Sequence, residues 1–86
     1  MKKILAIQGS DLKKINIKTD TTILLAAEAQ KRGYSIYYFE PENLSFLNGK
    51  VIASCKHIKI HDNKKKFYST IKAINFNLEK SNVILI

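Results

Sequence analysis

The sequence has little of what marks secreted or membrane proteins. Its 86 residues include a single cysteine, Cys55, which excludes an internal disulfide and is typical of a reducing cytoplasm. No apolar run approaches the roughly 20 residues that a membrane-spanning helix needs. The apolar run after Lys3 is too short for a signal peptide, and no small-residue cleavage site follows it. We therefore expect a cytoplasmic protein without a membrane partner.

Glycine is also scarce, with three residues in the chain. Gly9 stands alone after the first apolar run, so the G-x-G-x-x-G fingerprint of dinucleotide-binding proteins is absent. No glycine–lysine–serine/threonine run occurs either, which excludes a phosphate-binding P-loop. We expect no cofactor site within these 86 residues.

Acidic residues are few: seven face fifteen basic ones, and the net charge is +8. Such a charge indicates either a surface solvated by lysine or a nucleic-acid footprint. The basic residues are scattered, and no aromatic–glycine motif of an RNA-binding sheet accompanies them. These features favour the solvated surface. With 45% hydrophobic residues the chain is globular, and its length suits one domain that buries about 60–65% of its unfolded surface.

The first half of the chain reads as a strand, a polar loop, a helix and a second strand. The apolar run within Lys3–Gln8 predicts a strand covered on both faces. A helix capped by Thr19 or Asp20 should end at Gly33, before a strand over Tyr34–Phe39. Because the first half of this helix is apolar all round, we expect more than one neighbour to bury it. Such units build parallel sheets with helices on their faces.

The second half contains a strong hairpin signal. Asn48-Gly49 lies between Leu44–Leu47 and a second arm that runs to Ile60, and this dipeptide suits a two-residue hairpin turn. Phe67–Asn77 is ambiguous between helix and strand, whereas Val83–Ile86 predicts a second fully buried strand. The expected fold is α/β: a small, mainly parallel sheet with flanking helices and a β-hairpin extension. Since the last residue of a buried strand would place a carboxylate near the core, we expect a fragment of a longer protein.

The loop after the first strand is the first candidate site. Open α/β sheets bind ligands at the carboxyl ends of their strands. Polar side chains and free helix N–H groups there suit a carboxylate or phosphate; the side chains are Ser10, Asp11, Asn16, Lys18, Asp20, Thr21 and Thr22. For Asp20, capping of the helix is the favoured interpretation over ligand contact.

Two other clusters are weaker candidates. Cys55, His57 and His61 share one face of a strand, but at about 3.3 Å per residue the two histidines lie roughly 13 Å apart. That separation is too long for one metal ion with bonds of about 2 Å. A Cys55–His57 catalytic pair, roughly 6.6 Å apart, is equally disfavoured. We therefore expect neither a metal site nor a catalytic residue here.

Four aromatic residues lie within six positions and raise the question of a base-stacking platform. They are Tyr34, Tyr37, Tyr38 and Phe39. Adjacent positions on a strand point to opposite faces, so we expect core packing for at least half of them.

From Asn16 to Tyr38 the sequence closely resembles the N-terminal domain of prokaryotic glutathione synthetases. The family pattern is Asn-Ile-Lys-x-Asp-Ser/Thr, then an Ala/Leu-rich helix ending E-A-Q-x-R-G, then a strand with H/Y-x-Y. Matching positions are Asn16, Ile17, Lys18, Asp20, Thr21, Thr22, Glu28, Ala29, Gln30, Arg32, Gly33 and Tyr38. The order of hairpin and final strand also matches. The chain has Gly9-Ser10-Asp11 where the family has Met-Asp-Pro, and it ends before the family's Arg-x-Asp-Pro-Pro-Phe-Asp loop.

The resemblance implies a single pre-ATP-grasp domain over residues 1–86, without the ATP-grasp domain that follows it in the family. ATP and Mg²⁺ would be held in that later domain, where ATP phosphorylates γ-glutamylcysteine and glycine attacks the acyl phosphate. It further implies substrate-side roles for Asn16, Lys18, Asp20 and Thr21, and a strand over Phe67–Phe76 that continues the hairpin. We expect the isolated chain to be inactive.

The expected partners are an ATP-grasp domain or chain, a small peptide substrate, and further copies of the chain, since apolar surface left uncovered promotes self-association. Two alternatives stay open. One is a stand-alone α/β interaction or binding module derived from such an enzyme. The other is a basic nucleic-acid-binding domain, whose affinity would fall linearly with the logarithm of salt concentration.

Overall fold

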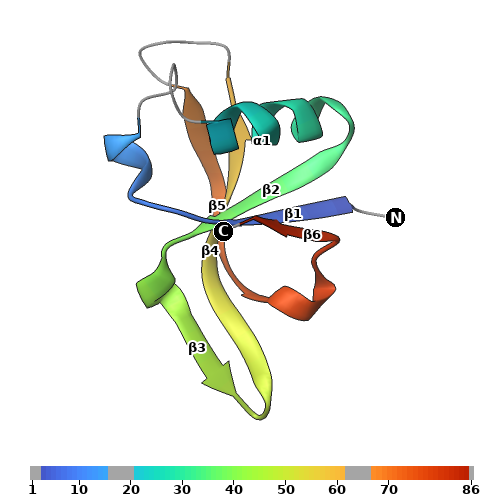
Figure 1. Ribbon diagram of the computed structural model, residues 1–86. Coiled ribbons are helices and arrows are strands. Elements are labelled where there is room, and N and C mark those ends of the chain that lie inside the picture. Colours follow the sequence, from blue (N-terminus) through green and yellow to red (C-terminus); the bar gives the residue numbers. More distant parts are fainter. Residues whose placement is uncertain (1–2, 16–20, 62–66, 86) are drawn as a thin grey trace.

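One curled sheet organises the chain in the computed structural model, which describes residues 3–15, 21–61 and 67–85. The sheet has six described strands: five run in the order β3-β4-β2-β1-β6, and the sixth, β5, pairs with the other edge of β4. Figure 1 shows the helix α1 (Thr21–Lys31) against this sheet and the β3–β4 hairpin extending away from it. The α/β class is therefore confirmed.

The parallel part of the sheet is small. Strand β1 (Lys3–Gln8) pairs in parallel with β2 (Tyr34–Phe39) and with β6 (Val83–Leu85). The predicted strands at these three places are confirmed. The predicted full burial of the last one is wrong, because β6 is an outer strand and Val83 and Ile84 are 41% and 44% exposed.

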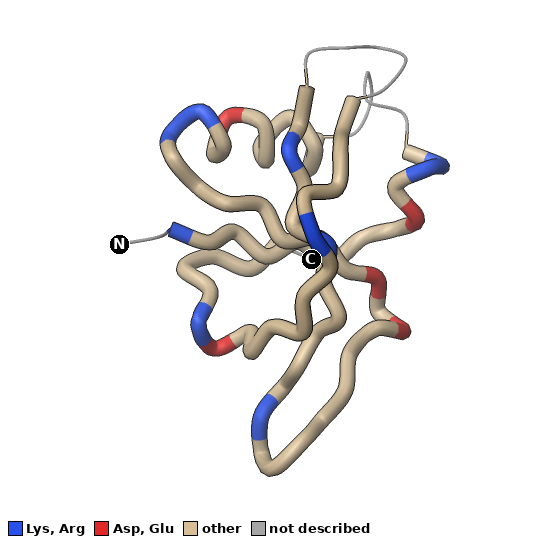
Figure 2. The backbone as a smooth tube through the Cα atoms, turned by 180° about the vertical axis from the view of Figure 1, so that it is seen from behind, with Lys and Arg blue, Asp and Glu red and all other residues tan. Residues whose placement is uncertain are grey.

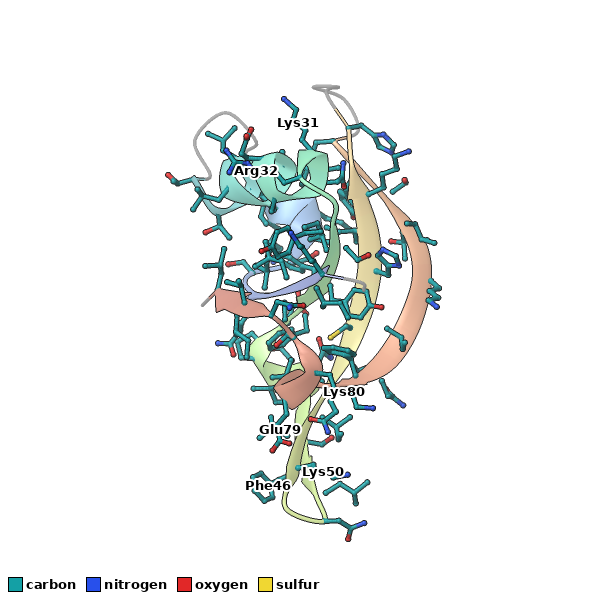
Figure 3. All side chains as sticks on the ribbon, turned by 90° about the vertical axis from the view of Figure 1, so that its right-hand side faces the viewer. Lys31, Arg32, Phe46, Lys50, Glu79 and Lys80 are labelled. Atoms are coloured by element: carbon teal, nitrogen blue, oxygen red, sulfur yellow. The ribbon has the colours of Figure 1, made fainter. Side chains whose placement is uncertain are left out.

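The hairpin is confirmed residue by residue. Strand β3 (Leu44–Leu47) pairs antiparallel with β4 (Lys50–Ile60). Asn48 and Gly49 both have positive φ, 51° and 76°, as a two-residue hairpin turn requires. A short 3-10 turn, η2 (Pro41–Asn43), precedes it. Phe46 is 75% exposed and projects from the hairpin (Figure 3).

The prediction of a mainly parallel sheet with several flanking helices is wrong. Strand β4 is eleven residues long and pairs antiparallel with β2, with β3 and with β5 (Tyr68–Asn77). Three of the five pairings between described strands are thus antiparallel. Of the two hairpin strands, β4 is central to the sheet and β3 lies at its end, and α1 is the one α-helix among the described residues. The strand inferred over Phe67–Phe76 is confirmed as β5.

Strand β5 carries a β-bulge. Its register against β4 shifts between His57, which pairs with Lys72, and Ile58, which pairs with Thr70. Ile71 is the extra residue, and it is 56% exposed. A bulge of this kind bends the strand and increases its twist.

Helix α1 ends as predicted but is buried on one side only. Gly33 follows it with φ 95°, the left-handed conformation that commonly ends a helix. Ile23 and Ala26 are buried against the sheet, whereas Leu24 and Leu25 are 56% and 54% exposed. The expectation that several neighbours bury this helix is therefore wrong for the described residues. The predicted caps, Thr19 and Asp20, lie outside them.

The two faces of the sheet carry separate cores. Tyr38 and Ile58 pack with Ile23 of α1 on one face. Tyr37 and Phe39 pack with buried residues of β4 and β5 on the other, where the Phe76 ring lies edge-on to Tyr37. The prediction that the β2 aromatic residues are mostly core is confirmed. No helix among the described residues combines the length and apolarity that crossing a bilayer requires.

Gln30 fastens the end of α1 to the sheet. Its side-chain Nε2 donates to the Ile60 carbonyl at 2.9 Å, and its Oε1 accepts from the Ile60 N–H at 2.8 Å. The amide thus takes the place of a neighbouring strand at the end of β4. Within the segment E-A-Q-K-R-G, Glu28 and Arg32 form an exposed pair at 3.3 Å, and Gln30 and Gly33 fix the helix end.

We expect Gln30→Ala to lower the free energy of unfolding by about 1–3 kcal/mol, because it leaves both backbone groups of Ile60 without this partner. Urea unfolding followed by circular dichroism measures the loss. Glu28→Ala is the matched control on the same helix, and it should cost less than about 0.5 kcal/mol because its ion pair is exposed. Equal losses in the two variants would contradict the role assigned to Gln30.

Candidate functional site

The carboxyl ends of β1 and β2 lie side by side and bring two loops together. Gly9, Ser10 and Asp11 follow β1, and Glu40 follows β2. The Gly9 N–H donates to the Phe39 carbonyl at 3.0 Å, which ties the first loop to the end of β2. Asp11 Oδ1 then accepts from the Lys13 N–H at 3.0 Å and starts the short 3-10 turn η1 (Leu12–Lys14).

Tyr38 supports the same loop from below. Its hydroxyl donates to the Ser10 carbonyl at 2.6 Å, and the side chain is 4% exposed. A Cβ atom on Gly9 would overlap this hydroxyl and would lie 3.0 Å from Cζ of the ring. Glycine at position 9 is therefore a steric requirement of this loop, because the Tyr38 ring fills the space where a side chain would begin.

A smaller cleft of about 200 Å³ opens on the side of this loop that faces α1. Gln8, Ser10 and Thr22 contribute its polar side chains, and Tyr38 forms one wall. It lies at the start of α1, as expected for the loop after the first strand. Of the predicted substrate-side residues, Asn16, Lys18 and Asp20 lie outside the described residues. Thr21 is exposed at the first position of α1 and does not line the cleft.

A larger cleft of about 340 Å³ also has Tyr38 in its wall. Three segments supply its polar groups: residues 11–13 at the start of η1, 40–43 around η2, and 54–56 in the middle of β4. These groups are Asp11, Lys13, Glu40, Asn43, Ser54 and Lys56. Its apolar lining includes Leu12, Phe39 and Cys55, all of which are buried.

Antiparallel pairing brings Lys56 to this cleft. Tyr38, near the end of β2, is the register partner of Lys56 on β4. A residue from the second half of the chain therefore stands beside the loops that follow β1 and β2. Sequence reasoning placed Asp11 in the candidate loop but missed Glu40, Asn43 and Lys56. The position of Glu40 directly after a strand was the available signal, whereas Lys56 had none.

Two acidic and two basic side chains line this cleft, and a further carboxylate, that of Glu42, acts on it. Partial burial raises the pKa of the Glu40 carboxyl above 4.5. A hydrogen bond with Glu42 and the negative charges of Glu42 and Asp11 raise this pKa further, whereas the positive charge of Lys56 lowers it. Two of the seven acidic residues of a chain with net charge +8 thus act on a third, Glu40. In Figure 2 the acidic positions just before η1 and at the start of η2 follow one another along one side of the molecule.

His57 on β4 and His61, directly after β4, have structural partners. The His57 ring lies against Tyr37 with centroids 5.0 Å apart, and His61 Nε2 lies 2.8 Å from the Ser69 hydroxyl. In the part of the chain that the structure describes, no three His, Cys, Asp or Glu side chains gather closely enough to hold a metal ion. These residues therefore do not supply a ligand set for Mg²⁺.

Cys55 is 1% exposed, and burial raises the pKa of its thiol from 9.0 to about 11. We expect the thiol to react with a disulfide reagent at pH 8 only when the chain unfolds, because the thiolate is the nucleophile. Since the folded state holds this proton more tightly, the thiol should also make stability fall as pH rises from 9 to 11.

The rate at which the thiol reacts, measured across a urea series, tests the expected protection, and a native rate equal to the unfolded rate would contradict it.

For the expected dependence of stability on pH, Cys55→Ala is the control. The stability difference between the parent chain and this variant should shrink as pH rises through the same window. A difference independent of pH would show that the thiol keeps its ordinary pKa.

Comparison with known proteins gives a consistent result. The family model described as "Prokaryotic glutathione synthetase, N-terminal domain" matches residues 3–86. A glutathione synthetase of Mesorhizobium japonicum is 31% identical over 86 residues, which are 100% of this chain and 28% of that protein. For that of Wigglesworthia glossinidia brevipalpis the identity is 37% over 94% of this chain and 26% of the relative. For that of Salmonella typhimurium it is 35% over 83% of this chain and 22% of the relative. The chain therefore spans about a quarter of the length of these relatives.

Proposed function

The chain belongs to the prokaryotic glutathione synthetase family, in which it matches the N-terminal domain, and from this premise we propose that it forms the substrate side of a glutathione synthetase-like ligase. The reaction joins γ-glutamylcysteine to glycine, and ATP supplies the phosphoryl group that activates the peptide carboxylate. The main support is the pair of clefts at the carboxyl ends of β1 and β2, where open α/β sheets bind ligands.

This chain's own contribution is to bind and orient substrate. The described residues offer no ligand set for Mg²⁺, and the sequence has no phosphate-binding P-loop. We propose that Asn16, Lys18, Asp20 and Thr21 bind the substrate, as the resemblance implies. Thr22, which follows them in the sequence, lines the smaller cleft. An ATP-grasp domain, in the same or another chain, would complete the site.

A chimaera tests this function. Residues 1–86 of this chain replace the matched N-terminal segment of the Salmonella typhimurium enzyme, and glutathione formation is measured with γ-glutamylcysteine, glycine, ATP and Mg²⁺. We expect the chimaera to be active and the 86-residue chain alone to be inactive. A folded chimaera that makes no glutathione overturns the proposed function, and ATP-dependent ligation by the isolated chain contradicts only the expectation that the isolated chain is inactive.

Within the chimaera, Lys18→Ala tests the substrate-side role proposed for this lysine. We expect kcat/KM for γ-glutamylcysteine to fall by about tenfold or more if the lysine contacts an anionic group of the peptide. Lys14→Ala is the matched control, because Lys14 is exposed on η1 and lines neither cleft. Equal effects of the two substitutions would contradict a specific role for Lys18.

Self-association is a second proposal, and it also supports the alternative of an interaction module. All four residues of β3 are exposed, the strand carries no charge, and β4 is its one partner among the described strands. An uncharged outer strand is a template for pairing with a second copy. Analytical sedimentation of the parent chain and of the Phe46→Ser variant tests this self-association. We expect the parent chain to form a dimer that the substitution weakens. A parent chain that is monomeric at all concentrations overturns the proposal.

A nucleic-acid partner has less support. Figure 2 shows lysine and arginine at separate places around the described chain rather than along one face. Binding with a steep salt dependence, which reports the release of several counterions, would favour that alternative.

A further inference from the structure

The larger cleft combines both signs of charge with an apolar lining. Asp11 and Glu40 carry carboxylates, Lys13 and Lys56 carry ammonium groups, and all four line the same 340 Å³ hollow. Phe39 and Cys55 beneath them are 2% and 1% exposed. Small-molecule sites combine apolar lining with a few placed polar groups that fix the orientation of the ligand. This cleft is richer in polar groups, since six of its eleven lining residues are polar or charged, which suits a ligand that is itself charged.

The lining indicates the chemistry of the ligand. A phosphate is disfavoured because two carboxylates face the hollow and the turns beside it are three-residue 3-10 turns rather than the start of an α-helix. A simple cation is disfavoured because two lysines line the same space. A small molecule that carries both an ammonium and a carboxylate satisfies both pairs.

We propose that this cleft binds the α-amino acid head of a γ-glutamyl peptide, with Glu40 and Asp11 facing its ammonium group and Lys56 and Lys13 facing its α-carboxylate. This inference rests on the proposed function and extends it to a part of the substrate that does not react. In γ-glutamylcysteine the head lies at the opposite end of the peptide from the carboxylate that is activated. Glycine carries the same two groups, but its amine must be uncharged to attack, so the γ-glutamyl head is the better occupant.

The electrostatics of the cleft suit an ammonium group. Partial burial raises the pKa of Glu40, and Glu42 and Asp11 add to the rise. A positive charge placed beside Glu40 would relieve this repulsion and favour the ionised carboxylate. The Asp11 carboxylate has a second oxygen besides the Oδ1 that accepts from the Lys13 N–H.

Calorimetry on the 86-residue chain tests the cleft directly. The probes are γ-glutamylcysteine, L-glutamate, glycine and N-acetyl-L-glutamate, which lacks the ammonium charge. We expect the first two to bind, N-acetyl-L-glutamate to bind about tenfold or more weakly than L-glutamate, and glycine to bind more weakly than L-glutamate.

Substitutions locate the binding. Glu40→Gln and Lys56→Gln should each weaken γ-glutamylcysteine binding by about tenfold. Glu79→Gln and Lys80→Gln are the matched controls: both residues are exposed, lie on the 3-10 turn η3 (Leu78–Lys80) (Figure 3) and do not line the cleft. These controls should bind as the parent does, and thermal unfolding should establish that all four variants are folded.

The pH dependence provides a readout that a merely structural role would not change. The charged groups that act on Glu40 are Glu42 beside it in η2, Asp11 before η1 and Lys56 on β4. Because the ammonium binds the ionised carboxylate, affinity should be lost as pH falls through the raised pKa of Glu40. Glu40→Gln should remove that dependence.

The outcomes separate this inference from the proposed function. Unchanged affinity in both cleft variants, equal binding of the acetylated probe, or no binding of any probe overturns the cleft proposal, and the activity of the chimaera then still decides the function. Binding that needs Glu40 and Lys56 supports the cleft. If the chimaera is nevertheless inactive, the cleft stands as an amino-acid site and the ligase function falls.

Discussion

Replacing Ile58 by alanine should lower the free energy of unfolding by about 2–5 kcal/mol, because it removes three buried carbons and leaves a cavity. Ile58 is 1% exposed, pairs with Ile36 on β2 and belongs to the core under α1. A domain of this size is stable by only about 4–13 kcal/mol, so the loss is a large share of the total. Urea unfolding at 25 °C measures it.

Ile71→Ala is the matched control for that experiment. It makes the same chemical change on the neighbouring strand, but Ile71 is the exposed residue of the bulge. Its effect should stay within about 0.5 kcal/mol. Similar losses at the two positions would contradict the division of β4 and β5 into buried and exposed residues.

Gly9→Ala should be the second large effect. The added methyl group overlaps the Tyr38 hydroxyl, so the ring or the loop must move. Overpacking of this kind costs about 1–3 kcal/mol. Displacing the hydroxyl also weakens its hydrogen bond to the Ser10 carbonyl, a further loss of about 0.5–1.5 kcal/mol. Urea unfolding measures the sum, and binding to both clefts should weaken because Tyr38 lines each of them.

A double-mutant cycle with Tyr38→Phe tests the steric explanation. Removing the hydroxyl removes the nearest atom to the added methyl group, so Gly9→Ala should cost less in the Tyr38→Phe background, with a coupling of about 1 kcal/mol or more. Gly33→Ala is the control: that site has open space but a φ of 95°, so its cost is a backbone effect and should not depend on Tyr38. Additive effects of Gly9→Ala and Tyr38→Phe would contradict the explanation.

The elements with strong local signals were predictable from the sequence. The apolar run of β1, the Asn48-Gly49 turn and the glycine that ends α1 each depend on residues a few positions apart. Their boundaries in the structure agree with the predictions because backbone conformation at these places follows from local sterics and hydrogen bonding. The ambiguous segment before Asn77 needed the family resemblance, since its apolar spacing fits either a helix or a strand.

Burial and strand direction were harder to predict, because they depend on partners far away in the chain. The apolar first turns of α1 predicted several neighbours, yet the described sheet covers one side and leaves Leu24 exposed. The sheet became mostly antiparallel because β4 is long enough to pair with three strands. No local pattern in Lys50–Ile60 specifies all three of these partners.

The candidate site divides in the same way. Asp11 was predictable because it follows the first strand, where ligands bind in such sheets. Lys56 was not, because only the register between β2 and β4 brings it beside Tyr38. The substrate-side roles inferred from the resemblance for Asn16, Lys18, Asp20 and Thr21 stay predictions.

The bulge in β5 has a consequence for how the chain behaves at high concentration. Strand β5 is ten residues long and has β4 as its one partner among the described strands. A regular strand of that length would offer a continuous ladder on which fibrils can grow. The extra residue at Ile71 divides the ladder into a three-residue and a six-residue run, 68–70 and 72–77, whose hydrogen-bonding groups are out of step. An incoming strand can match one run or the other but not both, which protects the longest outer strand against amyloid-like growth.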